Sequence, residues 1–226
     1  MNKIASRTTV KLFLWKGIHK MDRTYAKTTI FFGIALLLCL LLFSFLQADN
    51  LYGSVIRIHV LANSDSKEDQ EKKFLVRDAL LEYASENLGD FKTQAEAEAS
   101  LREKLCDFQT EAKRVLNENG CQSAVEVSLG EEYYSTRHYS GFSLPAGHYL
   151  SLQVKIGEAK GQNWWCVLFP PLCLSSSINT EDALLTAGMT KENTKTVTCD
   201  GEEYEIRFRV LEWFGSAKER IRSIFS

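Results

Sequence analysis

The sequence predicts an α+β fold in which two helices pack on a mainly antiparallel sheet, preceded by one N-terminal transmembrane helix. Three features support this prediction: an uncharged apolar run near the N-terminus, helical periodicity in the middle of the chain, and alternating residues in the second half. Short connections between the later strands favour antiparallel pairing. Helices and strands that segregate along the chain are typical of the α+β class.

The apolar run spans residues 30–46 and reads IFFGIALLLCLLLFSFL, with no charged residue. A helix rises about 1.5 Å per residue, so the run would be about 25 Å long. This length is close to the hydrocarbon core of a bilayer, which is about 30 Å thick. A buried core helix of this length would usually show a polar face, and this run has none. We therefore expect a transmembrane segment.

The leader before this run, residues 1–29, contains seven Lys or Arg and one acidic residue, for a net charge of +6. Such a basic flank holds the N-terminus in the cytoplasm, so the chain after the segment is expected to be exported. The segment is either a signal peptide or a signal anchor. Cleavage after Ala48 would place Leu46 where a small residue is preferred, which favours an uncleaved anchor followed by a linker over residues 47–54.

The remainder suits one exported domain over residues 55–214 and a C-terminal tail over residues 215–226. Its composition, 45% hydrophobic and 25% charged for the whole chain, is that of an ordinary globular protein. The exported part is acidic and has no basic patch before the basic residues of the tail. Nucleic acid is therefore not an expected partner.

The first elements of this domain are a strand and a helix. Residues 55–61, VIRIHVL, alternate between two faces and predict a β-strand. Ser66 and Asp69 form a capping box that starts a helix. This helix is expected to end near Leu88, since Gly89 suits a C-terminal cap.

A second helix is expected from about residue 93 to 117, with one apolar stripe formed by Leu101, Leu105, Phe108, Ala112 and Val115. Strands follow at residues 124–129, 132–139, 149–156, 164–169 and 204–210. The run 164–169 is wholly apolar and suggests a central strand, which Pro170 ends because proline cannot donate to a sheet ladder. Short helices are expected over residues 180–190 and 213–226.

Five cysteines follow the apolar run: Cys106, Cys121, Cys166, Cys173 and Cys199. An oxidising exterior permits disulfides among them, and Cys166 with Cys173 is a possible pair. Buried apolar thiols are the alternative. Zinc is disfavoured, because there is no C-x-x-C pair and no histidine at ligand spacing.

No nucleophile, zinc-protease or nucleotide-binding motif occurs, so we predict no catalytic, cofactor or metal residues. Cys166 lies in an apolar run and is expected to be packed rather than nucleophilic. A polar cluster could bind a cation, but a capped helix start explains it more simply; it comprises Asn63, Asp65, Glu68 and Asp69. In a strand, either Trp164 or Trp165 would face outward, where tryptophan is a natural anchor for a partner.

Two long stretches, residues 56–83 and 144–173, resemble a known family, as do Tyr134-Ser135-Thr136-Arg137 and the closing EIRFRVLEWF. The strings ANSDSKEDQ and NWWCVLFPPLC are its most specific parts. The chain resembles the stage II sporulation protein R family of endospore-forming Firmicutes. The resemblance implies a non-enzymatic signal, made in the forespore and exported into the space between forespore and mother cell. There it triggers a membrane-embedded aspartic protease of the mother cell, which processes pro-sigma-E.

The expected partners are therefore this protease and, through residues 30–46, the membrane, with no small-molecule substrate. The family supplies no contact residues, so the proposed binding surface is Trp164 or Trp165 with the polar positions Asn63, Asp65, Glu68 and Asp69. Two alternatives remain open. One is a cell-envelope hydrolase that uses Cys166 or an acidic pair, and the other is a structural envelope protein.

Overall fold

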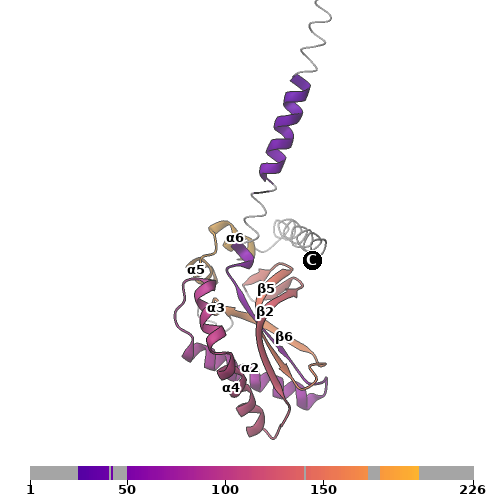
Figure 1. Cartoon of the computed structure of the whole chain (residues 1–226), viewed down its shortest axis with the longest axis vertical. Helices are drawn as coiled ribbons and strands as arrows, with labels where there is room; N and C mark the ends of the chain where they lie inside the picture. The colour runs from indigo at the N-terminus through magenta and orange to yellow at the C-terminus, as the bar shows by residue number, and fades with distance from the viewer. Residues whose placement is uncertain (1–24, 41, 43–49, 140, 173–178, 199–226) are drawn as a thin grey trace, which may run out of the picture. The chain divides into compact units, whose positions relative to one another are not determined.

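The computed structural model describes residues 25–40, 42, 50–139, 141–172 and 179–198 (Figure 1). The chain divides into two compact units, residues 1–46 and 47–226. In the first unit, residues 25–40 are helical and their large apolar side chains are exposed. No helix among the described residues is both long and apolar enough to cross a bilayer. The predicted span 30–46 includes residues that lie outside the described ones, at positions 41 and 43–46.

The second unit contains a four-stranded sheet in the order β2-β5-β1-β6. Its strands are β1 (Ile56–Leu61), β2 (Val125–Tyr134), β5 (Gly147–Ile156) and β6 (Asn163–Phe169). β1 pairs antiparallel with β6, and β2 pairs antiparallel with β5. The central pair, β1 with β5, is parallel. The short connections in the sequence predicted antiparallel pairing and gave no sign of this parallel pair. The long connection through the helices and β2 permits it, since parallel neighbours need a crossover.

Three helices cover one face of this sheet: α2 (Lys67–Asn87), α3 (Gln94–Glu103) and α4 (Leu105–Glu118) (Figure 1). The second predicted helix is thus two helices, which divide at Lys104. No glycine or proline marks the break, and the apolar stripe continues across it, with Leu101 and Phe108 both fully buried. The main core lies between these helices and the sheet; it includes Ile58, Val60, Val76, Leu80, Leu101, Phe108, Leu152 and Val154.

The opposite face of the sheet contributes to a second hydrophobic cluster, which includes Leu51, Val55, Tyr134, Phe142, Leu144, Tyr149, Val167, Leu184, Met189 and Val197. It involves β3 (Arg137–Tyr139), β4 (Phe142–Leu144), α5 (Thr180–Thr186) and α6 (Lys191–Thr198). The predicted strand 132–139 is divided between the end of β2 and β3. A helix within residues 180–190 is confirmed as α5, whereas α6 was not predicted.

Among the described strands β6 is the terminal one, so the prediction that it is a central strand is not met in that part of the sheet. Its run is apolar because both of its faces are covered: Leu168 belongs to the main core and Val167 to the second cluster. The predicted strand 204–210 and the helical tail lie outside the described residues.

Candidate functional site

Ser66 is the N-cap of α2, as predicted, but only half of the predicted capping box forms, because the Ser66 backbone N–H donates to Ser64 Oγ rather than to Asp69. The Asp69 backbone N–H donates to Ser66 Oγ over 3.2 Å. The Asp69 carboxylate accepts hydrogen bonds from Ser64 Oγ (2.5 Å) and Asn63 Nδ2 (2.8 Å). These bonds, with Ser64 the stronger influence, hold the pKa of Asp69 below its ordinary value. The Asp69 carboxylate therefore holds the side chains of the turn before α2 together, and its backbone N–H is capped by Ser66.

The same turn contacts the loop between β5 and β6. Asn63 Oδ1 accepts the Glu158 backbone N–H (2.9 Å), and Asp65 Oδ1 accepts the Gln162 backbone N–H (2.7 Å). A Cβ at Gly161 would overlap the backbone carbonyl of Ser64. Three of the four predicted polar contact residues are thus engaged within the domain, while Glu68 is exposed and pairs with Lys72 on α2. Their binding to a partner stays a prediction.

Trp164 and Trp165 lie on opposite faces of β6, and both are half-buried. Each has an arginine near its ring. The Arg77 guanidinium carbon is 5.2 Å from the Trp164 ring centroid, and that of Arg137 is 3.8 Å from Trp165. Neither tryptophan is fully exposed, and their role as partner anchors stays a prediction.

A polar cluster lies on the face of the sheet opposite α2, α3 and α4, and we call it the Arg57 cluster: Arg57, His59, Glu132, Tyr134, Arg137, Tyr139, Tyr149, Ser151 and Trp165. Its centre is Arg57, which is 0% exposed. The Arg57 guanidinium carbon lies 3.8 Å from the Tyr134 ring centroid and 4.9 Å from that of Tyr149. Arg57 Nη2 donates to the Tyr139 hydroxyl over 2.5 Å. Burial raises the pKa of all three tyrosines, so they are neutral neighbours of the cation.

His59 is the second buried polar residue of β1 in this cluster. Its Nδ1 lies 2.7 Å from Glu132 Oε1, and its ring stacks on Trp165 with 5.4 Å between centroids. Burial raises the pKa of Glu132, but the hydrogen bond and the charge interaction with His59 outweigh burial, and the net pKa lies below its ordinary value. Glu132 is therefore a carboxylate at neutral pH.

Several buried atoms of this cluster have no hydrogen-bond partner in the part of the chain that the structure describes. They are Arg57 Nε and Nη1, His59 Nε2, Glu132 Oε2 and Arg137 Nε. The alternation of β1 already placed Arg57 and His59 on one face. Sequence reasoning missed the site because it could not show that a second layer covers that face.

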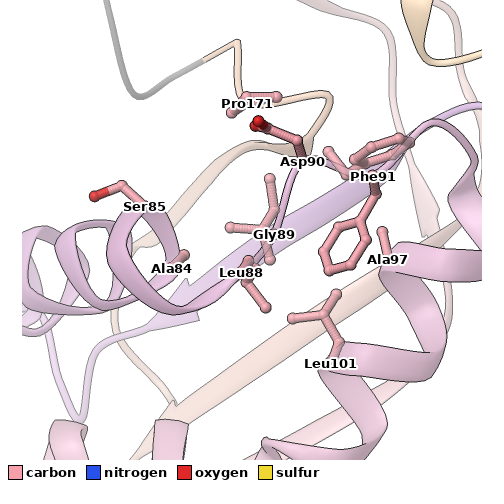
Figure 2. A pocket seen from close by; sticks show the side chains of 11 residues that line it. Ala84, Ser85, Leu88, Gly89, Asp90, Phe91, Ala97, Leu101 and Pro171 are labelled. Atoms are coloured by element: carbon pink, nitrogen blue, oxygen red, sulfur yellow. The ribbon is translucent and has the colours of Figure 1, made fainter.

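The described part of the domain also contains an apolar cavity of about 310 Å³ (Figure 2). It lies between the end of α2, the start of α3 and the end of β6. Figure 2 shows the side chains of Leu88, Phe91 and Leu101 around it, with Ser85 and Asp90 as its polar neighbours. This lining suits an apolar group and offers little chemistry of its own.

Glu132→Gln tests the pair of His59 and Glu132 without changing its shape. We expect the wild-type chain to be more stable than E132Q at neutral pH by about 1.5–3 kcal/mol, the usual value for a hydrogen bond to a charged group. Because the pKa of Glu132 is lowered in the folded state, this advantage is present above its ordinary value of 4.5 and is lost as pH falls below it. Urea denaturation of both chains across this pH range measures the difference.

The matched control for this experiment is Glu126→Gln, at an exposed position of the same strand. E126Q should follow the wild-type pH profile throughout. An E132Q chain that matches the wild type at neutral pH would contradict the stabilising role of the pair.

The cysteines and metal sites are the last candidates. Cys166 is disulfide-bonded, whereas Cys106 and Cys121 are free thiols. Cys173 lies outside the described residues, so its pairing with Cys166 stays a prediction. Within the described ranges, no group of three or more His, Cys, Asp or Glu side chains is placed to hold a metal ion.

Comparison with known proteins shows which family this domain resembles. The family model described as stage II sporulation protein R matches residues 52–179, which contain the whole four-stranded sheet and its helical layer. No solved structure matches this chain. The chain is also 31% identical to stage II sporulation protein R of Bacillus subtilis (strain 168) over 176 residues, covering 70% of this chain and 79% of that relative.

The domain that contains this mixed sheet is therefore that of a sporulation protein. More particularly, the chain belongs to the stage II sporulation protein R family, as the resemblance predicted.

Proposed function

We propose that this chain is an exported sporulation signal that activates a membrane-embedded aspartic protease of the mother cell, which then processes pro-sigma-E. Family membership carries this proposal, since it supports a sporulation role for the chain. The signal acts through its surface in the space between forespore and mother cell, and it catalyses no reaction.

Two features of the chain support export. The helix over residues 25–40 exposes large apolar side chains, which suits contact with lipid, and a leader of net charge +6 includes its first residues. Cys166 is disulfide-bonded, and disulfides persist mainly in oxidising compartments outside the cytoplasm. The same bond disfavours a hydrolase that uses Cys166, because the nucleophile in such enzymes is a free thiolate.

The test is co-expression of the full chain with the protease and pro-sigma-E, compared with a chain that lacks residues 1–48. We expect processing of pro-sigma-E to be lost in the truncated chain, because the domain stays in the cytoplasm. The truncation ends before Leu51, the first fully buried residue of the domain, so the core is retained.

Fusion of the truncated domain to an unrelated export signal is the control, and it should restore processing. Full-rate processing by the truncated chain without any export signal would contradict the proposal. If loss of the whole chain leaves processing unchanged, the structural envelope alternative is favoured instead.

A further inference from the structure

Among the described residues, the Arg57 guanidinium has fewer hydrogen-bond acceptors than its burial requires. Only Nη2 has a partner, the Tyr139 hydroxyl, whereas Nε and Nη1 have none in the described part of the chain. A buried polar group without a partner costs free energy, and a charged group costs more than a neutral one. The rings of Tyr134 and Tyr149 offset part of this cost through cation–π contacts, but they do not replace a counter-charge.

One neighbouring donor is in the same position, since Arg137 Nε is also buried without a partner among the described residues. His59 Nε2 and Glu132 Oε2 are buried without a partner as well, but a neutral His59 that donates from Nδ1 to Glu132 has no proton on Nε2, and a carboxylate oxygen only accepts, so neither atom adds a donor. The one carboxylate of the Arg57 cluster, Glu132, interacts with His59 through Oε1. The cluster therefore contains two arginines and one carboxylate, so its described residues have one positive charge in excess when His59 is neutral. An oxyanion would supply both the missing acceptors and the missing charge.

Carboxylate is the oxyanion that best suits these surroundings. The guanidinium is crowded by the Tyr134 and Tyr149 rings and by Tyr139, and a planar carboxylate is smaller than a phosphate. Arg137 and Tyr139 both come from β3, a strand of three residues that pairs with β4. A shift of this short element would remove Tyr139 from its contact with the Arg57 guanidinium.

We propose that Arg57, with Arg137 beside it, binds a carboxylate group. This group belongs either to a free carboxylic acid or to an acidic side chain of the partner protein. The site itself is inferred from the geometry alone, whereas the second source rests on the proposed function.

The first arm of the test uses acetate as the probe and the full chain, in detergent and with ¹⁵N-labelled arginine. The Arg57 Nε–H signal is identified by its loss in Arg57→Lys. We expect this signal to shift saturably as sodium acetate replaces sodium chloride at constant ionic strength. Arg77, a half-buried arginine on α2 paired with Asp78, provides the matched control, and its Nε–H signal should not move.

The second arm is processing of pro-sigma-E in the co-expression assay, with R57K compared with R77K. A saturable acetate shift with at least a tenfold loss of processing in R57K, but not in R77K, assigns the carboxylate to the partner. The same shift with normal processing in R57K assigns it to a free acid. If the Arg57 signal does not shift, the proposal is overturned.

The test still distinguishes its outcomes if R57K does not fold or if the proposed function is wrong. If R57K does not fold, magnetisation transfer from the Tyr134 and Tyr149 ring protons identifies the Arg57 signal in the wild-type chain. Failure of the proposed function would appear as absence of processing with the wild-type chain. That result would leave the acetate titration, and hence the carboxylate site, unaffected.

Discussion

Phe108→Ala should lower the free energy of unfolding by about 3–5 kcal/mol, the usual cost of removing a buried aromatic ring. Phe108 is 0% exposed, and it packs from α4 into the main core, where the Tyr83 ring lies 5.0 Å from its own. A loss of this size corresponds to a fall in melting temperature of roughly 6–20 °C for a domain of this length. Thermal unfolding followed by circular dichroism measures it.

Phe74→Ala is the matched control, because Phe74 lies on α2 and is 39% exposed. We expect F74A to lower the melting temperature far less than F108A. Equal losses in the two variants would show that the main core is not where the structure places it.

Gly161→Ala should have the second large effect, because the added Cβ would overlap the backbone carbonyl of Ser64. A backbone atom cannot rotate away as a flexible side chain can, so the β5–β6 loop must separate from the turn before α2. We expect a loss of about 1–3 kcal/mol, which is typical of overpacking at a close contact. The hydrogen bond from Gly161 N to the Ala62 carbonyl, 2.9 Å long, should break. Chemical denaturation and amide hydrogen exchange measure the two effects.

Gly130→Ala provides the comparison for this variant. Gly130 lies within β2, and a Cβ built there meets nothing within 4 Å. G130A should therefore remain within about 0.5 kcal/mol of the wild type. If G161A is equally well tolerated, the contact between loop and turn does not stabilise the domain.

The elements with long and regular signals could be predicted from the sequence. The strand at residues 55–61 and the capped start of α2 each depend on local features, and both are present. The parallel pairing of β1 with β5 could not be predicted, because pairing is decided by packing between distant segments. β3 and β4 contain three residues each, too few for an alternation to be recognised. α6 reads KENTKTVT and contains one apolar residue, Val197, so its buried side is formed mainly by Asn and Thr and could not be recognised as an apolar stripe.

In the candidate site, too, features set by neighbouring residues in the sequence could be predicted, and features set by distant residues could not. The turn at Asn63–Asp69 was recognised from its composition, and its capping role followed from residue spacing. The Arg57 cluster depends on residues from β1, β2, β3, β5 and β6, which the chain brings together only through its topology. Arg57 and His59 stood in an alternating strand, but the sequence could not indicate that β3 and the tyrosines bury them.

The adjacent tryptophans of β6 have a practical consequence for spectroscopy. Trp164 packs against the main core and Trp165 against the second cluster, so two neighbouring indoles probe two separate layers of the domain. Single-tryptophan versions of the chain would therefore distinguish a molecule that melts in one cooperative step from one whose layers come apart in succession.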